Sequence, residues 1–237
     1  MKMMNKYIIA LAAVAGLTVA GCSNEVPGDG KTAFGTLSTA SIALQVEDGI
    51  TSRAGEESVD TDNFFIEIKN DKDITVKEGI LKDLPEAIIL EEGDYTVHAC
   101  SPGELQEASW DPYYTGSSES FKIEENVITE IEPVMCKLVG TKVTVKLSEE
   151  LEKIVSSDCT VIVAVESDSK ASLTFDLDRI KENAPGYFDA LPGSKIGAII
   201  SCTVKGEEIT IYEEWESEQD TQHHIFEFKV KTSEGEK

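Results

Sequence analysis

Histidine is scarce in this sequence, with three residues, and no serine stands in a pattern typical of a catalytic nucleophile. His223 and His224 are adjacent, and adjacent side chains of a strand point to opposite faces, so the pair is unsuited to holding one metal ion. His98 stands alone, and no His/Cys spacing matches a zinc site. Ser194 lies near glycines but lacks the Gly-x-Ser-x-Gly pattern of hydrolase nucleophiles. We therefore predict no metal, no other cofactor and no catalytic residues, although the 45 acidic residues leave a two-carboxylate glycosidase open as a weaker alternative.

Cys22 is the residue for which the sequence predicts a definite reaction. Two lysines precede a run of about fourteen apolar residues, 7–20, which is shorter than the ~20 residues of a membrane-spanning helix and typical of a secretory signal. The run ends in Val-Ala-Gly-Cys, which resembles the bacterial lipobox, where the thiol is alkylated with diacylglycerol and cleavage leaves the cysteine as the first residue. We predict a signal peptide over residues 1–21 and a lipidated tether over residues 22–33. A plain secretory signal with an unmodified Cys22 is the alternative.

The charge of the chain excludes one class of partner. Lys and Arg total 21 against 45 Asp and Glu, which gives a formal net charge of −24 at pH 7. Such a surface repels phosphate backbones and anionic head groups, so we expect no nucleic-acid partner. The hydrophobic content of 41% is nevertheless enough for packed cores.

Alternation of apolar and polar residues with a period of two dominates the chain after the tether. About a dozen short runs of this kind are separated by turn signals, and no strand-helix-strand rhythm appears. This pattern predicts an all-β fold with two β-sandwich domains in tandem, over residues 34–138 and 139–237.

Two local patterns in the chain are specific enough to name residues. One strand places Phe64, Ile66 and Ile68 on a single face and is followed by a turn and another strand, which predicts a hairpin. The only helix that we predict covers residues 148–157, with Ser148 as its N-cap and acidic residues in its first turn.

Four cysteines remain after Cys22, an even number that permits disulfides in an exported protein. Cys159 and Cys202 each share a strand face with apolar residues, so both are expected to point inward, where they could be neighbours. Cys136 is in phase with apolar residues whereas Cys100 is in phase with polar ones, so a Cys100–Cys136 bridge fits poorly. Buried thiols that do not pair are the alternative.

Three segments of the first half carry a resemblance to a known family. They are Asp111–Gly116, Phe121–Ile123 and Cys136–Leu138, and the stretches TSRAG and LEEGDYTVHA also fit. With them the chain resembles a family of Bacteroidales lipoproteins of unknown function, over most of its length after the signal. That family is similar in outline to the fimbrillins of the same bacteria, which are lipoprotein precursors with two β-sandwich domains that polymerise by strand exchange.

The resemblance implies a site of proteolytic maturation between Arg53 and Ala54. The loop over residues 50–57 is small, polar and contains glycine, which suits proteolytic nicking. Cleavage there would release residues 34–46 as a removable strand, and a strand from another subunit would take its place. The polar stretch 231–237 has no alternation to donate, so the chain would accept a strand without donating one. An ordinary loop with a solvated Arg53 is the alternative.

Trp110, Tyr113 and Tyr114 surround a turn that Pro112 and Gly116 fix. Aromatic faces grouped in this way are able to stack on a sugar ring, and we consider them candidate ligand contacts. The alternative is that they close one end of a sandwich.

Together these features predict a lipid-anchored protein of the outer membrane or cell surface with a structural or adhesive role, as a fimbrillin-like subunit or accessory protein. The expected partners are the membrane, through the lipid anchor, and other pilus-type subunits, through strand addition. A monomeric surface lipoprotein that binds a glycan or a protein is the alternative. The sequence leaves open whether the body faces the periplasm or the outside.

Overall fold

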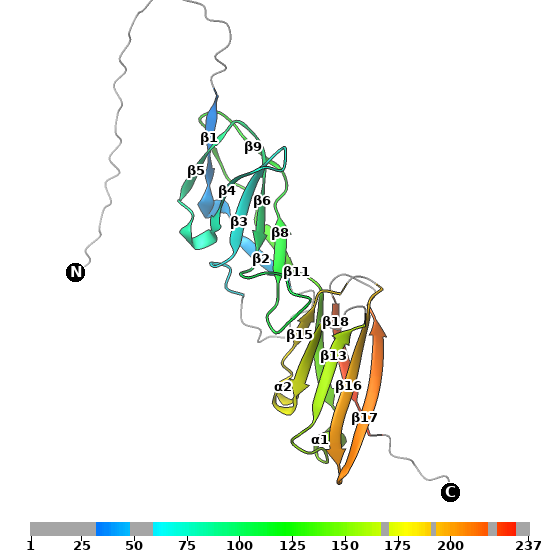
Figure 1. Ribbon diagram of the computed structural model, residues 1–237. Coiled ribbons are helices and arrows are strands. Elements are labelled where there is room, and N and C mark those ends of the chain that lie inside the picture. Colours follow the sequence, from blue (N-terminus) through cyan, green and yellow to red (C-terminus); the bar gives the residue numbers. More distant parts are fainter. Residues whose placement is uncertain (1–31, 48–58, 167–170, 191–192, 218–221, 231–237) are drawn as a thin grey trace, which may run out of the picture. The chain divides into compact units, whose positions relative to one another are not determined.

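The computed structural model describes residues 32–47, 59–166, 171–190, 193–217 and 222–230, and in this part of the chain the fold is all-β (Figure 1). Two short α-helices and two 3₁₀ turns interrupt the strands of these residues. None of the helices described is long and apolar enough to span a membrane. The predicted all-β class is confirmed.

Two sheets form the first sandwich. Their strands are β1 (Phe34–Ser38), β2 (Leu44–Glu47), β3 (Phe65–Asn70), β4 (Thr75–Ile80), β5 (Ala87–Glu91), β6 (Gly93–Cys100), β8 (Tyr114–Ser117), β9 (Phe121–Ile123), β10 (Ile128–Thr129) and β11 (Val134–Leu138). The smaller sheet has the order β10-β1-β5, and the larger has the order β2-β11-β8-β6-β3-β4, with β9 also paired to β6. Two 3₁₀ turns, η1 (Thr39–Ser41) and η2 (Leu81–Asp83), follow β1 and β4.

Two four-stranded sheets form the second sandwich. Their elements are β7 (Ala108–Ser109), β12 (Thr141–Leu147), α1 (Glu149–Glu152), β13 (Thr160–Val165), β14 (Ser172–Asp176), α2 (Leu177–Glu182), β15 (Gly186–Phe188), β16 (Lys195–Val204), β17 (Glu207–Glu216) and β18 (Gln222–Phe228). The sheet orders are β18-β12-β15-β7 and β14-β13-β16-β17.

The first core shows why the smaller and larger sheets must face each other. Phe64, Ile66 and Ile68 are at most 1% exposed, as the predicted strand face requires, and the predicted hairpin is the β3–β4 pair. Leu37 of β1 and Leu90 of β5 belong to the same buried cluster. Each sheet therefore covers the apolar face of the other. Removal of apolar surface from water in this way is the largest favourable contribution to folding.

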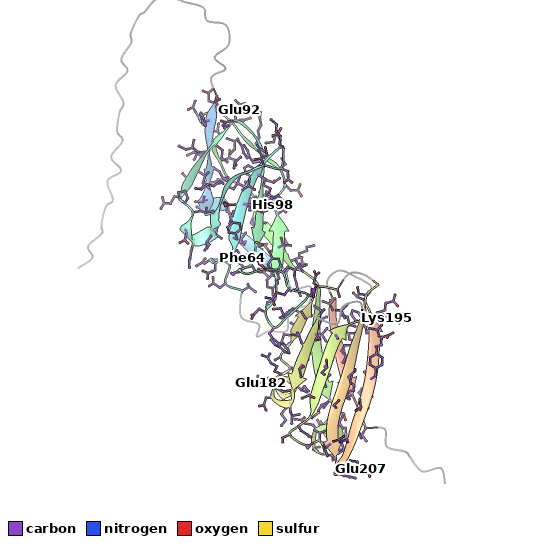
Figure 2. All side chains as sticks on the ribbon, viewed as in Figure 1. Phe64, Glu92, His98, Glu182, Lys195 and Glu207 are labelled. Carbon is purple, nitrogen blue, oxygen red and sulfur yellow. The ribbon has the colours of Figure 1, made fainter. Side chains whose placement is uncertain are left out.

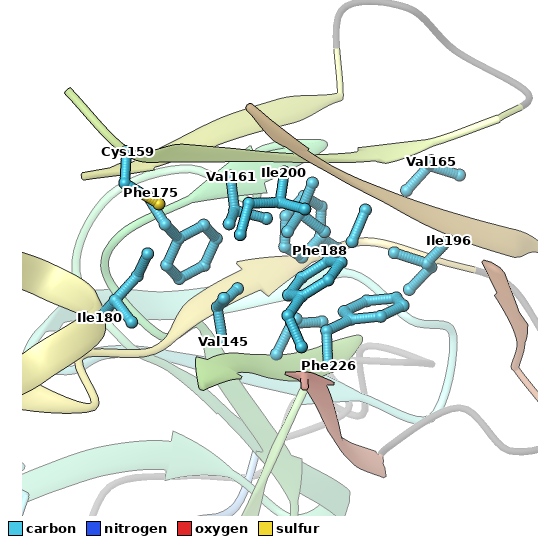
Figure 3. Close-up of a cluster of buried hydrophobic side chains, with 14 of the residues drawn as sticks. Val145, Cys159, Val161, Val165, Phe175, Ile180, Phe188, Ile196, Ile200 and Phe226 are labelled. Carbon is cyan, nitrogen blue, oxygen red and sulfur yellow. The ribbon is translucent and has the colours of Figure 1, made fainter. Parts of the chain in front are cut away.

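The second core is built in the same way from the two four-stranded sheets (Figure 3). Val161 of β13 and Ile200 of β16 come from one sheet, and Phe188 of β15 and Phe226 of β18 come from the other. All four are at most 2% exposed.

The helices illustrate one prediction that holds and one omission. The hydroxyl of Ser148 accepts a hydrogen bond from the Leu151 amide at 3.3 Å, so the predicted cap is present, although α1 is shorter than expected. Helix α2 was not predicted, because strand-like alternation runs directly into it. It is capped by the Asp176 carboxylate, buries Ile180 and ends at Asn183, which adopts a left-handed conformation with φ of 54°.

His224 of β18 is enclosed by aromatic rings of the second sandwich. Its ring stacks on Trp215 at a centroid distance of 4.3 Å and meets the edge of Phe226 at 4.5 Å. Burial lowers the pKa of His224 below its usual 6.5, and the neighbouring charge of His223 adds to the effect. The ring is therefore held in its neutral form.

Two neighbouring isoleucines of β16 provide a matched test of the second core. Ile200 is fully buried and Ile199 is 39% exposed on the opposite face. Ile200→Ala is expected to lower the free energy of unfolding by about 2–5 kcal/mol, because it leaves a cavity. Ile199→Ala should cost about 1 kcal/mol or less. Urea unfolding of both variants measures the difference, and equal losses would contradict the described core.

A second prediction concerns pH. Because the pKa of His224 is lower in the folded state than in the unfolded chain, the unfolded state takes up the proton first as pH falls below about 6.5. Stability is thus fully present above that pH and is lost below it. His224→Gln should lose less stability between pH 7.5 and 5.5 than the unaltered chain in urea unfolding. Identical losses in the two proteins would refute the assignment.

Candidate functional site

The segment over residues 34–47, called here the first segment, takes part in both sheets of the first sandwich. It contains β1, the turn η1 and β2. β1 is the central strand of the smaller sheet, between β5 and β10, and β2 lies at the end of the larger sheet, beside β11. The chain therefore crosses from one sheet to the other within this segment.

β1 is paired on both sides. It runs antiparallel to β5 and parallel to β10, where the Thr36 amide donates to the Val127 carbonyl at 2.9 Å. Leu37 is fully buried. A Cβ on Gly35 would lie 2.2 Å from the carbonyl oxygen of Glu124, so only glycine permits this close approach of the backbones. β1 is thus an integral part of the first core.

The rest of the first segment is attached more lightly. Ile42 is buried, and the Ser41 hydroxyl accepts the Ile131 amide at 3.1 Å. Among the described strands, β2 pairs with β11 alone, in parallel, and places Val46 opposite Cys136. Removal of the first segment would leave unpaired backbone groups on β5, β10 and β11, next to the apolar side chains that Leu37 and Ile42 now cover.

The predicted cleavage and lipidation residues lie outside the described residues. β2 ends at Glu47, and Arg53 and Ala54 fall in the undescribed range that follows it. Cys22 lies in the undescribed N-terminal range. Cleavage after Arg53 and lipidation of Cys22 therefore stay predictions.

The three aromatic residues of the predicted turn have three different environments. Tyr114 is buried in the first core. Trp110 packs against the second core, with its ring edge-on to Phe175 at 4.9 Å and the Arg179 guanidinium 3.8 Å above the ring centroid. Tyr113 alone lines an open cleft. The structure thus does not gather the three rings on one surface.

The cleft beside Tyr113 has a volume of about 130 Å³ and lies between the loop before β8 and strand β15. Its lining residues include two tyrosines, one leucine and three acidic residues: Tyr113, Tyr187, Leu105, Glu104, Asp111 and Asp189. A hydrogen bond with the Cys100 thiol, together with burial, raises the pKa of Tyr113 to about 12. The phenol is neutral at physiological pH, which suits hydrogen bonding to a neutral polar ligand.

Sequence reasoning named Tyr113 but not the other cleft residues Tyr187, in β15, and Asp189, directly after it, which lie more than seventy positions later. The short β7–β15 pairing brings the two regions together, since it places Ser109 opposite Tyr187. Two-residue strands such as β7 leave almost no periodic signal, so the sequence offered no way to find this contact.

The three histidines have separate neighbours in the structure. His223 lies within hydrogen-bonding distance of the Thr144 hydroxyl at 2.8 Å, whereas His224 stacks on Trp215. His98 lies beside the hydroxyl of Ser117 at 2.8 Å. In the described ranges no three His, Cys, Asp or Glu side chains are grouped so that they could hold a metal ion.

Several solved structures are similar to this chain. A candidate cell adhesion protein from Bacteroides fragilis is 12% identical with a TM-score of 0.41, and the match covers 74% of this chain and 83% of that one. The shaft pilin SpaA from Lactobacillus rhamnosus GG is 7% identical with a TM-score of 0.35, and the match covers 85% of this chain and 99% of that one. The Bacillus anthracis TIE protein is 14% identical with a TM-score of 0.30; the match covers 84% of this chain but spans only 34% of that one.

No curated protein matches the sequence. A family profile does match it, over residues 33–237, and that range includes every strand described above. The chain therefore belongs to the family described as DUF4493, a domain of unknown function.

Proposed function

We propose that this protein is a lipid-anchored cell-envelope protein with a structural or adhesive role, acting as a fimbrillin-like subunit or accessory protein. In this proposal Cys22 carries the lipid of the chain before cleavage after Arg53, and a chain that begins at Ala54 is held at the outer membrane or cell surface by the subunits that it joins. Residues 34–138 and 139–237 fold as two sandwich domains, and Ala108–Ser109 of the first range pair with β15 of the second. The proposal assigns no enzymatic role. Its support from the N-terminus is the basic start, short apolar run and Val-Ala-Gly-Cys ending.

The observation that carries the proposal is the position of the first segment. β1 and β2 complete the two sheets of the first sandwich, and they are joined to its other strands through the undescribed residues 48–58, which include Arg53. One cut after Arg53 would separate the first segment covalently while leaving the other strands of the sandwich in one chain. The vacated place would offer hydrogen-bonding edges and an apolar groove, which is what strand addition requires.

The negative charge of the chain opposes nonspecific association and so favours the binding of a specific partner strand. With a net charge of −24, two copies of the chain repel each other at a distance. A strand that fills the groove must therefore gain its affinity from backbone hydrogen bonds and from apolar side chains at alternate positions. The partner strand is therefore recognised by its alternation of apolar and polar side chains. The uncleaved chain is expected to remain monomeric.

The cleavage is tested by the N-terminal sequence of the protein isolated from the envelope of its native host. We expect chains that begin at Ala54 and run in assemblies larger than a monomer. Arg53→Gln should abolish the Ala54 start and leave the protein monomeric. Lys31→Gln, which removes one positive charge on the other side of the first segment, is the matched control and should be processed normally.

The contrary result is equally clear. Protein that begins uniformly at an acylated Cys22, stays monomeric and is unaffected by Arg53→Gln would remove the subunit proposal while leaving the lipid anchor intact. A soluble chain with an unmodified Cys22 thiol, found by mass spectrometry, would instead remove the anchor.

A second function is favoured by the cleft beside Tyr113. Two tyrosine rings with carboxylates around them are a common setting for sugar hydroxyl groups. In this version the protein is a monomeric surface lipoprotein that binds a glycan.

Tyr113→Ala tests this alternative, because it removes the one predicted contact that lines the cleft. The variant should lose retention of any glycan that the unaltered chain binds on an array, with an unchanged thermal midpoint. Tyr212→Ala, which removes an exposed tyrosine outside the cleft lining, is the control and should retain binding. An array without a bound glycan, or equal binding by both variants, would end this version.

A further inference from the structure

Cys159 and Cys202 face each other across two neighbouring strands of the second sandwich. β13 and β16 are antiparallel, with Thr160 opposite Ser201 and Val161 opposite Ile200. One step further along the same register places Cys159 opposite Cys202. Directly opposite residues of antiparallel strands have Cα atoms about 4.5–5.5 Å apart, within the range of about 4.4–6.8 Å that a disulfide spans.

The side chains also point to the same place. Cys159 is 1% exposed and Cys202 is 5% exposed, and both belong to the second core. Their thiols are hydrogen-bonded to each other. The two thiols therefore lie side by side between the paired strands, which is the arrangement that a cross-strand disulfide needs.

The other two cysteines lack this arrangement. Cys100 is in β6 and Cys136 is in β11, and β8 lies between these strands. In that sheet Ala99 is opposite Gly116, which is opposite Cys136, so Cys136 shares a face with Ala99. Cys100, the next residue along β6, points to the other face. A Cys100–Cys136 bond is excluded by two strand spacings and by direction.

We propose that Cys159 and Cys202 form a cross-strand disulfide in the exported protein, and that Cys100 and Cys136 stay reduced. Formation joins the two sulfur atoms and removes two protons and two electrons. The electrons are accepted by the disulfide of an oxidised thiol–disulfide oxidoreductase or of oxidised glutathione, which is reduced to two thiols. The bond would connect β13 and β16, the two central strands of their sheet.

The burial of the pair determines when the bond forms. Burial raises the pKa of the Cys159 thiol to about 12 and also raises that of Cys202. The thiolate is the attacking species in disulfide exchange, so the folded, reduced protein is slow to react. Oxidation thus belongs to the period before or during folding, and the finished bond is shielded from reductants.

Peptide mapping of the full chain tests the bond independently of export and assembly. The reduced, unfolded chain is refolded in a buffer of reduced and oxidised glutathione, and free thiols are then alkylated in denaturant. Trypsin places the four cysteines that follow Cys22 on separate peptides, residues 83–122, 123–137, 154–170 and 196–205. We expect 154–170 joined to 196–205, with the other two peptides alkylated.

Two matched variants check what the bond does. Cys202→Ala and Cys136→Ala each remove one buried thiol. Refolding with the glutathione pair rather than with a reductant alone should raise the thermal midpoint of the Cys136→Ala protein by about 5–15 °C, as in the unaltered chain, and should leave Cys202→Ala unchanged.

If a variant fails to fold, the peptide map of the unaltered chain still tests the disulfide. Alkylation of both Cys159 and Cys202 after oxidative refolding, or a peptide in which Cys100 is joined to Cys136, would overturn the proposal. Since refolding needs no host, such a result would leave the proposed envelope role untouched.

Discussion

The pairing of the first segment with strands from the far end of the same sandwich is the contact that closes the first core. β1 lies parallel to β10 and β2 lies parallel to β11, so residues about ninety positions apart share one backbone ladder. Leu37 and Ile42 close the core from this segment. Everything that we propose about strand addition depends on this arrangement, because only a strand that completes a core leaves a useful groove when it departs.

The second sandwich also pairs a strand near its beginning with its last described strand. β12 lies parallel to β18 over seven residue pairs. β12 follows β11 after a short connection at Gly140, where a φ of 81° and a carbonyl oxygen 2.3 Å from an ideal Cβ both require glycine. The β12–β18 pairing closes one sheet of the second sandwich, and the proposed disulfide would add a covalent link in the opposite sheet.

Periodicity predicted the strands well and their partners poorly. The faces of Phe64, Ile66 and Ile68 and the cap at Ser148 follow from local patterns. β5 and β6 are separated by Glu92 alone, which would suit a hairpin, yet they belong to different sheets. Each strand contributes apolar side chains to the same core from its own sheet. Helix α2, strand β7 and the cleft beside Tyr113 depend on contacts between distant residues, which a period-two pattern does not contain.

The acidic surface and the protected edges make sense together if the first segment is exchangeable. A protein that accepts a foreign strand carries the hazard that any unpaired edge will bind its own copies. β17, at the edge of its sheet, carries Glu207, Glu208, Glu213, Glu214 and Glu216, so a second copy approaching this edge meets like charge. The vacated position between β5 and β10 would differ, because it combines free backbone groups with an apolar floor. In this proposal the acidic edge strand β17 repels a second copy of the chain. The position between β5 and β10 would become able to bind a strand only after cleavage.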